Sequence, residues 1–144
     1  GLLDLPVLYL SRGIMERKTD YYRLLQEVRT KDSWEEWILF VLGAVERSSG
    51  HTLRLISSIK ELLEKTIETC RSRLPRTTYS KELIERLFVQ PYVKTEHLVK
   101  AGIAERRTAA KYLRQLEEIG VLSSFKAWKE TIFVNTGLVK ALKE

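Results

Sequence analysis

The chain has 144 residues, of which 44% are hydrophobic, a net charge of +6 and a single cysteine, Cys70. These values indicate a folded protein with a packed core, and they exclude an internal disulfide and a cysteine-cluster metal site. The longest apolar run, at 37–45, is far shorter than the roughly 20 residues that span a membrane. The first residues do not resemble a signal peptide, so we expect a cytoplasmic protein with no membrane partner.

The first 30 residues show apolar residues at helical spacing. Asp4, just before Leu5 and a proline, is suited to cap a first helix that contains the stretch VLYLSRGIMERK. Leu5, Leu8 and Ile14 then share one apolar face. Thr19 is suited to cap a second helix through YYRLLQEVR.

A third helical segment is predicted to begin after Asp32 or Ser33, one of which would cap it, and to extend to about residue 73. A continuous helix of this length would be about 60 Å long. The SSG sequence at 48–50 predicts a kink or break, because serine and glycine are poor residues for a helix interior. Four later apolar residues are spaced to pack either onto the 8–28 helices or onto a second copy of the chain, and a homodimer is therefore expected. They are Ile56, Ile59, Leu63 and Ile67.

The second half of the chain contains three further predicted helices in about 40 residues. Pro75 ends the long helix, and Ser80 is suited to cap a short one. Another begins near Thr95, and after a break at Gly102 a third continues to Gly120. This arrangement is typical of a helix-turn-helix.

After Gly120 the apolar residues alternate, which predicts two short strands, VLSSFKAW and ETIFVN, in a β-hairpin. A last helix is predicted at 136–143. The predicted fold is therefore mainly α: helices and a long connecting helix at 1–74, followed by a winged helix-turn-helix domain at 75–144.

The last helix of the helix-turn-helix is the candidate DNA-binding element. Ala109, Leu113 and Leu116 recur at core spacing, which leaves basic residues on the opposite face. Residues 75–144 also contain 13 Lys and Arg against 8 Asp and Glu, a balance that attracts an anionic partner. An ordinary solvated face is the alternative, and Glu105 at the helix start favours it because a carboxylate repels phosphate. The residues predicted to contact double-stranded DNA are Arg106, Arg107, Thr108, Lys111, Arg114, Lys126 and Lys129.

Three stretches of the first half, LDLPVLYLSRGI, YYRLLQEVR and WEEW, resemble the C-terminal part of Fic family proteins. Many members of that family continue into a long helix and a winged helix, with sequences close to LEEIGVL and the FVN of this chain. The resemblance implies a parent protein that transfers AMP from ATP to a hydroxyl group of a target protein. Gly13 stands where the family often has an aromatic residue, and glycine is expected to weaken that helix by about 1 kcal/mol.

The Fic catalytic signature, which resembles His-x-Phe-x-Asp/Glu-Gly-Asn-Gly-Arg, does not occur in this sequence. Neither His51 nor His97 belongs to a catalytic or metal-ligand motif. We therefore expect no catalytic residue, no cofactor and no metal in this chain, and we expect it to be a C-terminal fragment whose natural neighbour is an upstream Fic domain.

The leading hypothesis is that the winged helix binds DNA and thereby regulates or localises a parent AMP transferase. The alternative hypothesis keeps the same fold but assigns it to protein interaction or dimerisation, with the helix at 55–70 as the contact surface and no DNA binding.

Overall fold

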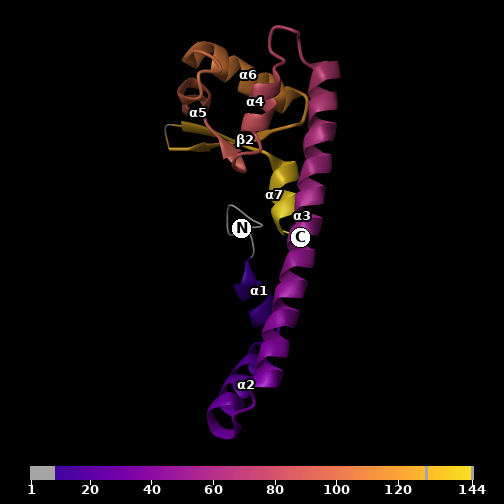
Figure 1. The fold of residues 1–144 in the computed structure, drawn as a ribbon. Helices are drawn as coiled ribbons and strands as arrows, with labels where there is room; N and C mark the ends of the chain where they lie inside the picture. The colour runs from indigo at the N-terminus through magenta and orange to yellow at the C-terminus, as the bar shows by residue number, and fades with distance from the viewer. Residues whose placement is uncertain (1–8, 129, 144) are drawn as a thin grey trace. The chain divides into compact units, whose positions relative to one another are not determined.

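A computed structural model describes residues 9–128 and 130–143, and it is mainly α, as predicted (Figure 1). The predicted cap at Asp4 and the apolar residues Leu5 and Leu8 lie outside the described residues, as does Lys129. Among the described helices, none combines the length and the apolar character needed to cross a membrane.

The chain packs as two compact units, Gly1–Ile56 and Ser57–Glu144, called the N-terminal and C-terminal units below. The division lies inside the long helix. Leu63 and Ile67 of this helix pack against the core of the C-terminal unit. Both side chains thus contact the chain's own C-terminal half, which was not predicted, and packing of this helix onto a second copy stays a prediction.

The N-terminal unit consists of α1 (Leu10–Met15), α2 (Lys18–Lys31) and the first part of α3 (Trp34–Arg73). Aromatic rings hold α2 against α3: the ring centroids of Tyr21 and Trp37 are 5.2 Å apart. Such pairs stabilise a fold beyond the apolar area that they bury.

The cap of α2 differs from the predicted one. Thr19 does not cap α2, which begins one residue earlier and is preceded by Arg17, with no side-chain cap. The Arg17 guanidinium instead lies 2.6 Å from the Asp20 carboxylate, and this contact lowers the pKa of Asp20. Asp32 ends α2 in the left-handed conformation, with a φ of 55°, and accepts a hydrogen bond from the Trp34 indole. Its side chain thus ties the start of α3 to the end of α2.

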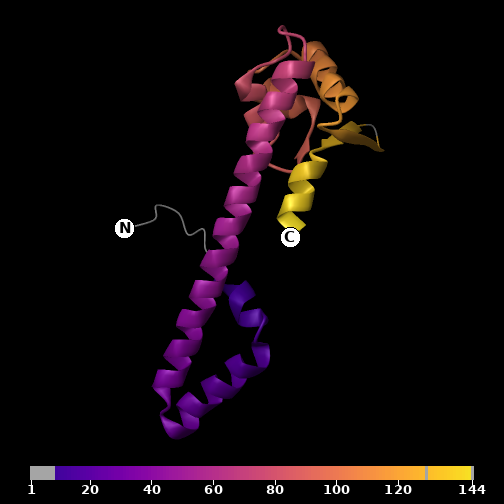
Figure 2. The ribbon, with the colours of Figure 1, turned by 90° about the vertical axis from the view of Figure 1, so that its right-hand side faces the viewer.

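Helix α3 is continuous over 40 residues, so the predicted break at 48–50 was wrong (Figures 1 and 2). Two hydroxyls of this region donate hydrogen bonds within the helix: Ser49 to the Glu46 carbonyl and Thr52 to the Ser48 carbonyl. Ser48 is buried, because α1 packs on it. Tertiary packing therefore outweighs the low helix propensity of this segment.

Gly13 is the point at which α1 meets α3. A Cβ atom built on Gly13 would lie 2.6 Å from the Ala44 carbonyl oxygen and 2.7 Å from the Ser48 hydroxyl. The Arg47 guanidinium donates a hydrogen bond of 3.2 Å to the Gly13 carbonyl. The glycine that we expected to weaken α1 is the residue that allows α1 to approach α3.

The C-terminal unit contains the three predicted helices, α4 (Lys81–Arg86), α5 (Thr95–Lys100) and α6 (Arg106–Glu118). Ser80 caps α4, as predicted, and accepts a hydrogen bond of 3.1 Å from the Leu83 amide. Positive φ values at the two predicted glycine breaks, 68° before α6 and 80° after it, explain why glycine occupies these turns.

Strands β2 (Ser123–Ala127) and β3 (Glu130–Val134) form the predicted hairpin, and α7 (Thr136–Lys143) is the predicted last helix. The strand β1 (Tyr92–Val93) was not predicted, because two residues show no alternation; it pairs antiparallel with β3 and gives the order β1-β3-β2. Helix α7 lies beside the later part of α3, where it brings Gly137 close to the Leu62 side chain (Figure 2).

The core of the C-terminal unit lies between α4, α5, α6, the end of α3 and the inner face of the sheet. Burial raises the pKa of the Cys70 thiol to about 11, so that this cysteine stays protonated and unreactive at neutral pH. The buried residues of this cluster are Cys70, Leu74, Leu83, Ile84, Leu87, Val93, Leu98, Ala109, Leu113, Leu116, Leu122 and Phe133.

Candidate nucleic-acid interface

Helix α6 is anchored by its inner face. Ala109, Leu113 and Leu116 are fully buried, as their spacing predicted. At 100° per residue, this anchoring directs Arg107, Lys111 and Arg114 to solvent. The orientation of the basic face is therefore set by the core and not by the charges themselves.

The outer face of α6 is basic. Arg107, Lys111 and Arg114 are exposed, and together with Thr108 and the half-buried Ala110 they line a shallow depression of about 660 Å³. None of these three cations forms an ion pair within the described part of the chain. The structure thus brings together four of the residues that the sequence predicted as DNA contacts.

The order of charges along α6 is opposite to that of four other helices of the chain. Helices α2, α3, α4 and α5 each have an acidic residue in the first turn and a basic residue in the last. Helix α6 has neither: it begins with Arg106 and Arg107 and ends with Glu117 and Glu118. Because the N-terminus of a helix carries a partial positive charge, this order costs stability and concentrates positive potential at one end.

Arg106 belongs to a second depression, of about 460 Å³, between α5, α6 and β3. Two ion pairs are found around it, Lys94 with Glu130 and Lys100 with Glu96, each at 2.5 Å. These contacts raise the pKa of Lys94 and lower the pKa of Glu96. The nearby carboxylates are thus already neutralised by lysines, and Arg106 is separated from the other predicted contacts.

Glu105 precedes α6, where it is exposed and forms no side-chain cap. Its carboxylate faces solvent beside Arg106, so it reduces the positive potential of this end without cancelling it. The carboxylate that favoured the solvated-face alternative is therefore outnumbered by the adjacent arginines.

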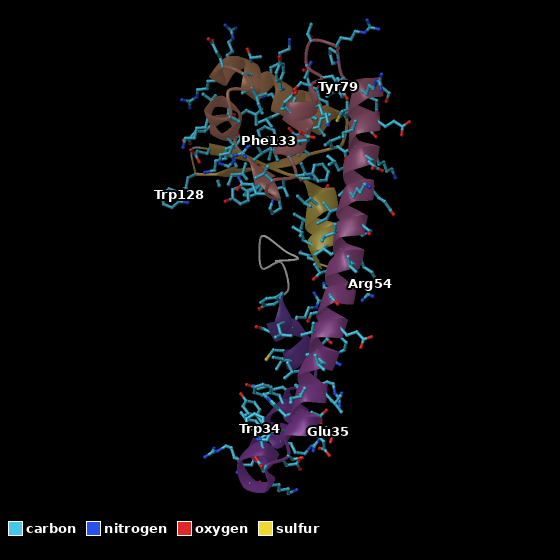
Figure 3. The ribbon with its side chains drawn as sticks, viewed as in Figure 1. Trp34, Glu35, Arg54, Tyr79, Trp128 and Phe133 are labelled. Atoms are coloured by element: carbon cyan, nitrogen blue, oxygen red, sulfur yellow. The ribbon has the colours of Figure 1, made fainter. Side chains whose placement is uncertain are left out.

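The hairpin carries one predicted contact that the structure describes, the exposed Lys126 on β2. It also carries a residue that sequence analysis missed. Trp128, at the hairpin tip, is 102% exposed and has a φ of 56° (Figure 3). The sequence feature that pointed to a binding role for Trp128 is the pair of lysines that flank it in KAWK.

The outer face of the sheet forms a depression of about 330 Å³ lined only by apolar residues from β1, β2, β3 and α7. Phe125 and Tyr92 are about half exposed there. The residues that line it are Pro91, Tyr92, Phe125, Ile132, Val134 and Val139.

Residues 62–138 match the family model described as "Protein adenylyltransferase SoFic-like, C-terminal domain". The chain belongs to this Fic family. The match confirms the resemblance found in the sequence, and it begins in the last part of α3 and ends in α7. It therefore covers the helices and strands on which the basic face and the hairpin lie.

The histidines of this Fic family chain have ordinary structural partners. His51 contacts the Arg12 guanidinium at 2.8 Å, and the Nδ1 atom of His97 lies 2.9 Å from the Gln90 amide nitrogen. Within the described residues, no cluster of His, Cys, Asp and Glu side chains is arranged to hold a metal ion.

Proposed function

We propose that the C-terminal unit is a winged-helix module that binds double-stranded DNA and thereby regulates or localises the parent Fic family protein. Membership in an adenylyltransferase family supports the role of the parent. The order of three helices and a β-hairpin supports the winged-helix interpretation.

The reversed charge order of α6 is the observation that carries this proposal. Charged residues near a helix end contribute about 0.3 to 1 kcal/mol each according to their sign. A helix whose outer face serves only solubility gains stability from acidic residues in its first turn, as α2, α3, α4 and α5 do. The arginines at the start of α6 lack this stabilisation of the helix N-terminus. The phosphates of a DNA backbone supply the missing negative charge, because they bind both the arginine side chains and the N-terminal amides of the helix.

The outer face of α6 also has a suitable shape for the major groove. Ala110, between Arg107 and Arg114, is small, so the helix backbone can approach base edges closely. The major groove of B-DNA admits one α-helix, and residues near the helix N-terminus reach the bases. In this arrangement Arg107 contacts bases, while Lys111 and Arg114 contact phosphates.

Salt dependence of duplex binding tests the proposal. Lys111→Ala is expected to lower the slope of log affinity against log salt by about 0.9, because one counterion-releasing contact is lost. Arg107→Ala is expected to weaken a specific site by about 1 to 3 kcal/mol and to relax the preference there. Fluorescence anisotropy at two or more salt concentrations measures both effects.

Lys65→Ala is the matched control, because Lys65 is exposed on α3, away from α6. It should leave the slope unchanged, and the melting temperature of every variant should stay close to that of the parent chain. Equal slopes for the parent chain and Lys111→Ala, or binding by the parent chain that does not respond to salt, would contradict the proposal.

We also expect this chain to bind no ATP above background, because AMP transfer requires a base, a phosphate cradle and metal ligands. Neither His51 nor His97 is followed by the phosphate-binding sequence of the Fic signature. Isothermal calorimetry with Mg²⁺ and ATP measures this directly. Micromolar, Mg²⁺-dependent binding would show that the chain has a nucleotide site of its own.

A scaffold is the second candidate function, and an exposed apolar face of α3 in the N-terminal unit favours it. Such a face indicates a protein partner, either an upstream Fic domain or a second copy of the chain. Its residues, each more than half exposed, are Ile38, Leu39, Leu42, Leu53 and Ile56.

Light scattering separates these two partners. A homodimer is expected to become monomeric in Leu42→Asp, because a carboxylate on this face cannot be buried unpaired. A 16.8 kDa species at all accessible concentrations of the parent chain would exclude the second copy and leave the upstream domain as the partner of this face.

A further inference from the structure

Trp128 is placed where neither folding nor solubility favours a tryptophan. Its side chain is fully exposed (Figure 3), although tryptophan buries a larger apolar area than most other residues when a partner is present. Its backbone has a φ of 56°, which is common for glycine and asparagine and an outlier for a bulky residue. Strained and exposed residues of this kind cluster at binding sites.

The hairpin tip lies close to the N-terminal end of α6. Glu130 and Thr131, which follow the tip, line one depression together with Arg106 and Ala110 of α6. A duplex that received α6 in its major groove would therefore bring its adjacent groove to the hairpin. Trp128, which is fully exposed at the hairpin tip, then faces this groove.

Charge distinguishes the possible partners of Trp128. The sequence around it is FKAWKE, and Lys126 is exposed on β2. Two copies of this chain repel each other, because residues 75–144 contain 13 Lys and Arg against 8 Asp and Glu. A polyanion instead gains from the same lysine and from the arginines of α6.

We propose that Trp128 is an apolar wedge that the hairpin inserts between stacked bases of a DNA duplex, so that binding bends the DNA at a flexible base step. This inference rests on the proposed DNA-binding function and adds a second, shape-dependent contact to that of α6. Apolar wedges of this kind kink a duplex at the inserted step, and steps such as TA unstack most easily. The tryptophan would thus provide sequence preference without a hydrogen bond to a base.

The test compares the parent chain with Trp128→Asn, Trp128→Phe and Lys126→Ala. Each is titrated with duplexes of about 20 base pairs that carry dyes at both ends and contain either a central TA step or an uninterrupted A-tract. Energy transfer between the dyes reports bending, and anisotropy reports affinity. Asparagine suits a positive φ, so Trp128→Asn should melt no lower than the parent chain, and a loss of bending cannot then be a loss of fold.

We expect the parent chain to raise energy transfer and to prefer the TA duplex by about fivefold or more, and Trp128→Asn to lose both effects while keeping the parent salt slope. Trp128→Phe, which keeps a flat apolar ring, should retain part of the bend. Lys126→Ala should lower the salt slope and still bend the DNA. These four results together separate the wedge from a phosphate contact.

Three results overturn the inference in distinguishable ways. Salt-dependent binding with the same bend and the same preference in Trp128→Asn leaves the DNA-binding function standing and removes the wedge. Absence of salt-dependent binding by the parent chain removes both. A parent dimer that Trp128→Asn converts to a monomer in light scattering would instead assign Trp128 to the sheet of a second copy.

Discussion

Replacement of Leu113 by alanine is expected to lower the free energy of unfolding of the C-terminal unit by about 2 to 5 kcal/mol. The Leu113 side chain is fully buried in the core between α6 and the rest of the unit. Truncation removes its transfer free energy and leaves a cavity that the surrounding helices fill only in part. Urea denaturation followed by circular dichroism measures the change.

Lys111→Ala is the matched control for this experiment, since it lies on the same helix two residues away and is exposed. It should change stability by no more than about 0.5 kcal/mol. A similar loss in both variants would mean that α6 is not anchored by its inner face. Because the core orients α6, Leu113→Ala should also weaken DNA binding without removing any DNA contact.

Gly13→Val is expected to destabilise the N-terminal unit by about 1 to 3 kcal/mol. A Cβ atom at this position would lie 2.6 Å from the Ala44 carbonyl oxygen and 2.7 Å from the Ser48 hydroxyl. The first of these is a backbone atom, so α1 must move away from α3 to relieve the clash. That movement also lengthens the hydrogen bond from Arg47 to the Gly13 carbonyl.

Gly50→Ala is the control for the second prediction. A Cβ atom on Gly50 would come no closer than 3.6 Å to the flexible end of Arg54. Alanine should therefore stabilise α3 by about 0.5 to 1 kcal/mol, the usual gain over glycine in a helix interior. Thermal melting of both variants settles the matter: a lower melting temperature for Gly50→Ala, or an unchanged one for Gly13→Val, would contradict this account of the contact between α1 and α3.

The C-terminal unit was predicted more accurately than the N-terminal one, for a physical reason. Its elements are short, and local residues mark where they begin and end. The Ser80 hydroxyl accepts the hydrogen bond that caps α4, and Gly102 and Gly120 adopt the positive φ values of the turns before and after α6. Such determinants act within a few residues of the chain, so the sequence displays them directly. The alternation of the hairpin strands is local in the same sense.

Predictions failed where distant residues decide the structure. The predicted break at 48–50 did not occur, because α1 packs on Ser48 from 35 residues earlier in the chain. The same contact reversed the expected role of Gly13. Strand β1 was missed because its formation depends on pairing with β3, some 40 residues later.

In the candidate site too, local sequence spacing predicts some features and contacts between distant residues decide others. The 3.6-residue period of α6 was sufficient to place Arg107, Lys111 and Arg114 on one face opposite Leu113. The separation of Arg106 into a different depression depends on α5 and β3, and no local pattern contains that information. Trp128 ends the first predicted strand and is flanked by Lys126 and Lys129 in the sequence, but neither feature indicates that its side chain is fully exposed.

The sequence by itself determined the family, the mainly α class, the order of the helices and hairpin strands at 75–144 and the basic face of α6. Each of these follows from interactions between residues close in the chain, or from the spacing of apolar residues along one element. Only the tertiary structure decided that α3 is unbroken, that Gly13 serves a close helix contact and that Trp128 stands fully exposed. These features depend on which distant surfaces meet, and burial and steric contact between distant segments are properties that a linear pattern does not contain.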